Sequence, residues 1–202
     1  MKNVNITYTI TREGIFPPIF KRYGDAGFDL RCGKHFYLKP GGNCVPCGTK
    51  FAIPYGHEGQ IRPRSGNSVN GIPAVHVDYF FKKCGVNYMN WAAQPDHCKG
   101  DSIYDAIERF IDAHDEVEFY EDELIRIPVN DAKVDVGTID AGYRKEVSTI
   151  VQFKGSGLYI IPRNARISQM VINALPTVTL AEGEVNDDTE RGTAGFNSTG
   201  VM

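Results

Sequence analysis

Five short stretches of the sequence carry side chains that could bind a phosphorylated substrate. The C-terminal stretch RGTAGFNSTG, residues 191–200, combines an arginine with glycine, serine and threonine, as in loops that wrap phosphate groups. Such loops normally precede a helix, whereas only two residues follow this one. Four further stretches join it, in chain order DAGFDL (25–30), RPRSG (62–66), GTIDAGYRKEV (137–147) and RISQMVI (166–172).

Each of these stretches is a weak signal when taken alone. An Arg-Ser-Gly is usually a turn, an aspartate in a hairpin usually forms the turn, and a glutamine in a strand is usually an edge polar group. Together and in this order, the five stretches resemble the five motifs of the trimeric dUTP diphosphatases (dUTPases). The resemblance covers nearly the whole chain except about residues 77–133, and phage members of that family also carry insertions.

The resemblance implies a fold, a reaction and an assembly. The fold is an all-β, jelly-roll-like (β-clip) subunit, and the reaction is hydrolysis of dUTP to dUMP and pyrophosphate by attack of water at the α-phosphate. The assembly is a homotrimer in which each site takes motifs one, two and four from one chain, motif three from a second and the C-terminal arm from a third. Mg²⁺ is the implied cofactor, held by phosphates and waters, with Asp29 anchoring the water shell from outside.

The same resemblance assigns roles to individual residues. Asp140 matches the general base, and Gln169 binds an α-phosphate oxygen or orients the attacking water. Tyr143 matches the aromatic side chain that packs on the deoxyribose and leaves no room for a 2′-hydroxyl. The backbone of the third motif would pair with uracil and exclude a 5-methyl group. The substrate-binding residues are then Gly137, Thr138 and Ile139 on the hairpin, Arg64, Ser65 and Gly66 on the second motif, and Arg191, Phe196, Asn197, Ser198 and Thr199 on the arm, where Phe196 would stack on the uracil.

Several positions depart from the family pattern. Lys145 stands where a glycine usually follows the Tyr-Arg pair, Asn197 replaces a glycine of the arm, and Val134 stands where many bacterial members have an asparagine. No departure removes a charged or reacting group. These departures bear on which nucleobase the site selects and not on the reaction itself.

The elements that must position these residues follow a period of two. Alternating polar and apolar residues, separated by glycine- and proline-bearing turns, indicate an all-β barrel, sandwich or jelly roll. The predicted strands cover residues 3–10, 35–38, 50–53, 58–62, 148–153, 158–161 and 166–173. We treat residues 1–202 as a single domain, and we expect residues 182–202 to be a mobile arm because they are polar and glycine-rich.

Residues 77–133 break the strand pattern and look like an insertion. The segment SIYDAIERFIDAHDE predicts a helix with a capping box at Ser102 and Asp105 and an apolar stripe that includes Ile107 and Ile111. Ten Asp or Glu lie between residues 101 and 123, and we interpret them as a solvated outer face. The insertion could shield the base pocket, brace the trimer or bind a protein partner.

Composition excludes several classes of protein. A net charge of −3 argues against a nucleic-acid-binding protein, and the sequence has no apolar run of about 18 residues and no N-terminal signal peptide. We therefore expect no membrane association and a cytoplasmic location, in the host cytoplasm if the gene belongs to a phage. Five cysteines fit a reducing compartment. Cys44, Cys47, Cys84 and Cys98 with His97 could form a zinc set, but free thiols are the favoured interpretation.

Two alternative functions stay open at this point. A dCTP deaminase of the same fold would need a glutamate base, and Glu146 lies close to the third motif. A regulatory binding protein would instead use the acidic insertion, with or without hydrolysis.

Overall fold

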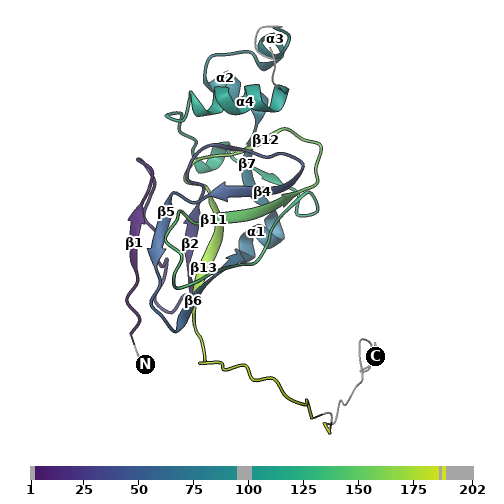
Figure 1. Cartoon of the computed structure of the whole chain (residues 1–202). Helices are drawn as coiled ribbons and strands as arrows, with labels where there is room; N and C mark the ends of the chain where they lie inside the picture. The colour runs from purple at the N-terminus through teal and green to yellow at the C-terminus, as the bar shows by residue number, and fades with distance from the viewer. Residues whose placement is uncertain (1–2, 95–101, 187, 190–202) are drawn as a thin grey trace.

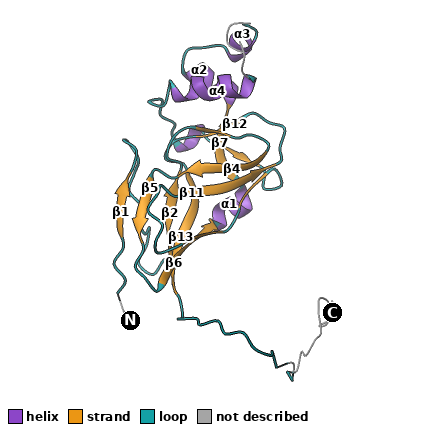
Figure 2. Cartoon of the chain, viewed as in Figure 1, coloured by secondary structure: helices purple, strands orange, loops and turns teal. Residues whose placement is uncertain are grey.

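The structure, a computed structural model, describes residues 3–94, 102–186 and 188–189 of the chain. The strands build one body, with three helices at one end and an extended C-terminal segment at the other (Figures 1 and 2). The prediction of a mostly-β subunit with a small helical part is confirmed. The strands are β1 Thr7–Ile10, β2 Gly27–Arg31, β3 Phe36–Tyr37, β4 Gly41–Pro46, β5 Thr49–Ala52, β6 His57–Pro63, β7 Ile72–His76, β8 Ile125–Ile127, β9 Ala132–Val134, β10 Gly137–Ile139, β11 Ser148–Phe153, β12 Tyr159–Ile161 and β13 Arg166–Ala174.

Four sheets surround the main hydrophobic core. The sheet that matters most for the site has the order β10-β6-β13-β2, and all its pairs are antiparallel. The others have the orders β4-β11-β9, β3-β12-β7-β8 and β1-β5. Inward-facing residues alternate along the strands, as in β11, where every second side chain is buried. This alternation is the reason that a period of two in the sequence predicted the strands.

The predicted strands agree with the observed ones, with some differences at their ends. The prediction for residues 148–153 matches β11 at both ends, whereas the first predicted strand, 3–10, is regular only over β1. All four residues of β1 are exposed, and within the described residues this strand pairs with β5 alone. Strands β2, β4, β7, β8 and β9 were not predicted, and β10, expected as part of a hairpin-like segment, pairs with β6. Glycine and proline in the β4 sequence GGNCVP hide its alternation.

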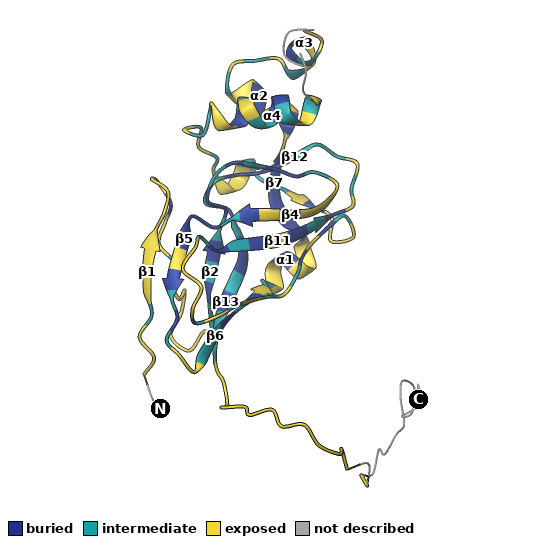
Figure 3. Ribbon diagram, viewed as in Figure 1, coloured by how far each residue is buried: buried dark blue, intermediate teal, exposed yellow. Residues whose placement is uncertain are grey.

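Helices α2 Val77–Lys83, α3 Tyr88–Ala92 and α4 Ile103–Asp112 pack around a second, smaller core. Phe80, Phe81 and Trp91 are buried there, and the Phe81 ring stacks on Phe110 with 3.8 Å between centroids. Ser102 caps α4, because its Oγ accepts a hydrogen bond from the Asp105 N–H, but the reciprocal half of the predicted capping box differs, since the Asp105 carboxylate accepts from the Ser102 hydroxyl at 2.7 Å. In Figure 3, α4 carries both buried and exposed residues, as expected for a helix with one face on a core. Strand β8 lies within residues 77–133 and β9 begins there, and the two strands return the chain to the main sheets.

Five of the nine described acidic residues between 101 and 123 are exposed and four are half-buried, so the predicted solvated face is only part of their role. Asp112 pairs with Lys34 at 2.6 Å, and Glu108 pairs with Lys39 at 3.0 Å. Asp115 accepts hydrogen bonds from the His35 N–H and from Arg163. These carboxylates therefore connect α4 and the turn after it to the strand-bearing part of the chain.

The cysteines do not form a metal set within the described residues. Cys44 is exposed whereas Cys47 is buried, and burial raises the pKa of the Cys47 thiol to about 12. Within residues 3–94, 102–186 and 188–189, no group of three His, Cys, Asp or Glu side chains could hold a metal ion. Cys98 and His97 lie outside the described residues.

Candidate active site

Three of the five motifs meet at a small hollow, which we call the phosphate pocket. It has a volume of about 200 Å³. Asp29 enters from β2, Gln169 from β13, and Arg64 follows β6. Ser65 and Gly66 form the first turn of α1 (Ser65–Asn70), where backbone N–H groups lack intrahelical acceptors. The remaining lining residues are Ile19, Lys21, Asp25, Ala26 and Gly27.

Strand register brings these residues together from distant parts of the sequence. Gln169 lies opposite Asp29 on one side and opposite Arg62 on the other. Gly27 allows this close approach, because a Cβ there would lie 2.8 Å from the Met170 carbonyl oxygen and 3.4 Å from Gln169 Oε1. A larger residue at position 27 would therefore disturb the strand that carries Gln169.

Asp29 is the electrostatic centre of the pocket. Its carboxylate accepts hydrogen bonds from Arg64 Nε at 2.6 Å and Nη2 at 3.4 Å, and from Arg166 Nη1 at 3.4 Å. The Asp29 side chain is 20% exposed, so these charge-assisted bonds are partly shielded from water. Gln169 Nε2 donates to the Pro63 carbonyl at 3.0 Å, which fixes its amide and turns one face toward the pocket.

Residues that sequence reasoning missed hold this arrangement. Arg166 was quoted in the fourth motif but was given no role, because its contact with Asp29 depends on strand register. Buried Asn67 donates to the carbonyls of Arg166 and Ile167, both at 3.0 Å, and so fastens α1 to β13. Nothing in the sequence around Asn67, which lies in a short polar helix, indicates these two hydrogen bonds.

The third motif lies elsewhere in the same chain. β10 pairs with β6 so that Ile139 faces Gly59, whereas Arg64 follows the other end of β6. Five residues of extended strand separate Gly59 from Arg64, or roughly 16 Å at the usual rise per residue. Asp140 is exposed, and Tyr143 is 38% exposed. A single chain therefore does not bring Asp140 to the phosphate pocket.

The hairpin that bears Asp140 is anchored at its far end by Glu146. The Glu146 carboxylate accepts a hydrogen bond from the Gly48 N–H at 2.7 Å and from Arg12 Nε at 3.1 Å. The Tyr143 hydroxyl donates to the Glu146 carbonyl at 3.0 Å. Both oxygens of this carboxylate are thus engaged, since Arg12 Nη2 also lies 3.3 Å from the second one.

The C-terminal candidates cannot be placed. Arg191, Phe196, Asn197, Ser198 and Thr199 lie outside the described residues. Residues 182–186 are described, and they are exposed and without regular structure.

Comparison with known proteins gives one consistent result. The dUTPase family model matches residues 16–95. The deoxyuridine 5′-triphosphate nucleotidohydrolase of Caulobacter vibrioides is 31% identical over 190 residues, covering 91% of this chain and 85% of that protein. The Sinorhizobium medicae protein of the same name is 29% identical and covers 94% of this chain and 86% of its own length.

Solved structures with the same fold come from staphylococcal phages. The dUTPase of Staphylococcus bacteriophage 80alpha with dUpNHpp has a TM-score of 0.62 at 18% identity, over 98% of this chain and 99% of that one. The dUTPase of phage phi11 of S. aureus, described with a species-specific insert, has a TM-score of 0.56 at 15% identity, over 92% and 99%.

Proposed function

The chain belongs to the dUTPase family and hydrolyses dUTP to dUMP and pyrophosphate, and from this premise we propose how its residues divide that reaction. The phosphate pocket of one subunit binds the triphosphate, and Asp140 of the partner subunit supplies the base. The observation that carries this proposal is the separation of the third motif from the pocket along β6. A general base must reach its water within hydrogen-bond distance, so the base has to come from another copy.

In this proposal the protein contributes mainly position and charge. Arg64 and the N–H groups of Ser65 and Gly66 bind phosphate oxygens, and Gln169 holds the α-phosphate or its attacking water. Asp140 takes a proton from the water, whose oxygen attacks the α-phosphorus. The bond from that phosphorus to the oxygen bridging the β-phosphate breaks, and pyrophosphate leaves.

Mg²⁺ is proposed as the cofactor of this site, and the residues present fit it as an ion bound through water. A carboxylate has about four lone-pair positions, and Asp29 already uses three of them on Arg64 and Arg166. One position then remains to accept a hydrogen bond from a metal-bound water. Asp25 also lines the pocket. When bound, the ion would neutralise charge on the phosphates. A phi11 dUTPase variant is described with a structural Mg(II) ion.

Glu146 is poorly suited to the role that a dCTP deaminase would require. Its carboxylate is held by Gly48 and Arg12, so it serves to fix the hairpin. This observation favours the hydrolase over the deaminase.

Four features stay predictions: a homotrimer, an arm that closes the site, a cytoplasmic location and a protein partner for residues 77–133. Within the described residues, no helix is long and apolar enough to cross a membrane.

A substrate panel tests the proposed function. The four common dNTPs, dUTP and UTP are supplied with Mg²⁺, and release of pyrophosphate and of ammonia is measured for each. We expect pyrophosphate from dUTP far faster than from any other nucleotide, and loss of activity when EDTA removes the metal. Ammonia released from dCTP would instead establish the deaminase, and comparable rates for dTTP or UTP would contradict the proposed selectivity.

A further inference from the structure

A second hollow, which we call the basic cavity, lies beside the phosphate pocket. Its volume is about 460 Å³, against about 200 Å³ for the pocket. Lys21 and Arg64 line both hollows, but Ser65, Gly66 and Gln169 line only the pocket. The opposite wall of the basic cavity comes from residues 119–126, which sequence reasoning placed in the insertion and which include Phe119, Glu121, Leu124 and Arg126.

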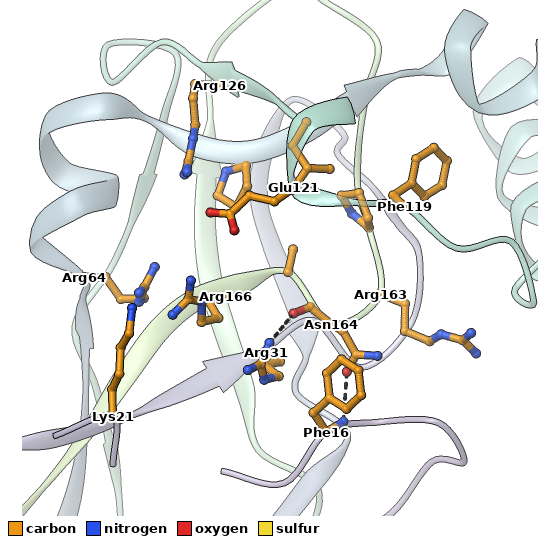
Figure 4. Close-up of a pocket in the computed structure, with 14 residues that line it drawn as sticks. Phe16, Lys21, Arg31, Arg64, Phe119, Glu121, Arg126, Arg163, Asn164 and Arg166 are labelled. Atoms are coloured by element: carbon orange, nitrogen blue, oxygen red, sulfur yellow. Dashed lines mark hydrogen bonds between the residues drawn. The ribbon is translucent and has the colours of Figure 1, made fainter. Parts of the chain in front are cut away.

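The cavity carries more positive charge than its surroundings balance. Six basic side chains line it, against one carboxylate, that of Glu121: they are Lys21, Arg31, Arg64, Arg126, Arg163 and Arg166. Asp29 pairs with Arg64 and Arg166, and Asp115 pairs with Arg163. Among the described residues, no carboxylate lies within ion-pair distance of the three that remain, Lys21, Arg31 and Arg126. Figure 4 shows Arg126 and Glu121 facing the guanidinium groups of Arg64, Arg166 and Arg31 across the cavity.

Arg31 is the residue that most needs a partner. Its Nε is buried and has no hydrogen-bond acceptor within the described part of the chain. Its Nη1 donates to the Asn164 carbonyl at 2.8 Å, and its guanidinium lies 5.3 Å from the centre of the Phe16 ring. Burial and the nearby charges of Arg166 and Arg64 lower the pKa of Arg31, and Asp29 offsets this only in part. An anion in the cavity would offset this unfavourable burial of positive charge.

We propose that the basic cavity is a second anion site, which takes a phosphate or diphosphate group between Arg31 and Arg166 on one wall and Arg126 on the other. Guanidinium groups that converge from two walls match the several oxygens of a phosphate, and each would donate charge-assisted hydrogen bonds. The ligand is either free pyrophosphate or the phosphate tail of a nucleotide. Because one wall belongs to residues 119–126, the anion would join this segment to the arginines that flank the substrate phosphates.

The test measures binding to the full-length protein while its catalytic sites are filled with dUpNHpp. Isothermal titration with inorganic pyrophosphate is one arm, and titration with dATP is the other. We expect about one pyrophosphate to bind per chain under these conditions. If dATP binds more tightly than pyrophosphate at this site, the natural ligand is the phosphate tail of a nucleotide. If dATP binds no more tightly than pyrophosphate, the natural ligand is the free anion.

Three variants separate this site from a general charge effect. Arg126→Gln should weaken pyrophosphate binding about tenfold, whereas Glu121→Gln should tighten it several-fold because it removes the one repelling carboxylate. Lys154→Gln, at an exposed lysine outside both hollows, is the control and should change nothing. Affinity for dUpNHpp should stay within about twofold in all three.

Several outcomes would overturn the proposal. One is no pyrophosphate or dATP binding once dUpNHpp is present, which would mean that another part of the protein fills the cavity. Another is equal weakening by Arg126→Gln and Lys154→Gln. A third is weaker binding in Glu121→Gln, which would show that this residue supports the wall and does not repel an anion.

Discussion

The Asp29 carboxylate sets the direction of two arginines before any substrate is bound. Arg64 Nε lies 2.6 Å from one of its oxygens and Arg166 Nη1 lies 3.4 Å from the other. In the proposed reaction, guanidinium groups held in this way would need little reorganisation when the triphosphate binds. The motifs named Asp29 and Arg64, but only the register of β2 and β13 reveals that Arg166 joins them.

Replacing Asp140 with Asn tests the base at the scale of one residue. The amide keeps the shape but cannot accept a proton, so kcat should fall by roughly 10²–10⁴-fold. The dissociation constant for dUpNHpp should remain nearly unchanged. The measurement is steady-state pyrophosphate release together with titration of dUpNHpp. Asp78→Asn, at an exposed aspartate on α2, is the control, and an active Asp140→Asn variant would remove this residue from the mechanism.

Replacing Asn67 with Ala tests the fastening of α1. The change leaves the buried carbonyls of Arg166 and Ile167 without their side-chain donor, and should lower the free energy of unfolding by about 1–3 kcal/mol. Denaturant unfolding measures this loss. Asn70→Ala, at an exposed position of the same helix, should have a far smaller effect. Equal losses would mean that the two hydrogen bonds of Asn67 do not decide the result, since Asn→Ala raises helix propensity at both positions.

At the scale of elements, the sequence predicts what depends on local alternation and misses what depends on pairing. The alternation in residues 148–153 and the N-cap of α4 at Ser102 were readable because each needs only neighbouring residues. The short helices α1, α2 and α3 were not predicted, since five to seven residues are too few to show a helical period. The second core was also out of reach, because Tyr37 and Ile160 join it from distant strands.

His35 links the main sheets to residues 77–133 and gives that contact a pH dependence. Its Nδ1 accepts the Arg163 N–H at 3.1 Å, and its Nε2 lies 2.7 Å from the Val117 carbonyl, to which the neutral ring donates. Asp115 and Glu116 favour the charged ring, and Arg163 opposes it, but burial dominates and lowers the pKa of His35. The unfolded chain therefore binds this proton more readily than the folded one.

The stabilisation from His35 is consequently complete above the unfolded pKa of about 6.5 and is lost as the pH falls below it. Unfolding by urea at pH 7.5 and pH 5.5 measures this loss. The titration of a single group can change the free energy of unfolding by at most about 1.4 kcal/mol per pH unit. His35→Gln should be less stable at pH 7.5 and should show a smaller fall between the two pH values. An unchanged pH dependence in the variant would assign the effect to other groups.

At the scale of the whole molecule, one chain holds the parts of the site at two ends of a strand. The phosphate pocket lies at the Pro63 end of β6, and the Asp140 hairpin lies at the Gly59 end. Family resemblance predicted a site shared between subunits, and the separation within one chain supports it. Which surfaces meet could not be read from the sequence, because an interface depends on the shape of both faces.

Complementation between two inactive variants tests the shared site most directly. Arg64→Gln removes a phosphate ligand, and Asp140→Asn removes the base, so neither variant alone should turn over dUTP. The two variants are mixed in equal amounts, unfolded together and refolded. If each site lies at an interface and takes Arg64 from one chain and Asp140 from its neighbour, about a quarter of the sites in a ring should combine an intact Arg64 with an intact Asp140. We predict that pyrophosphate release returns to about a quarter of the wild-type rate. A mixture that folds and assembles but stays inactive would show that each site draws both residues from one chain, and would contradict the account.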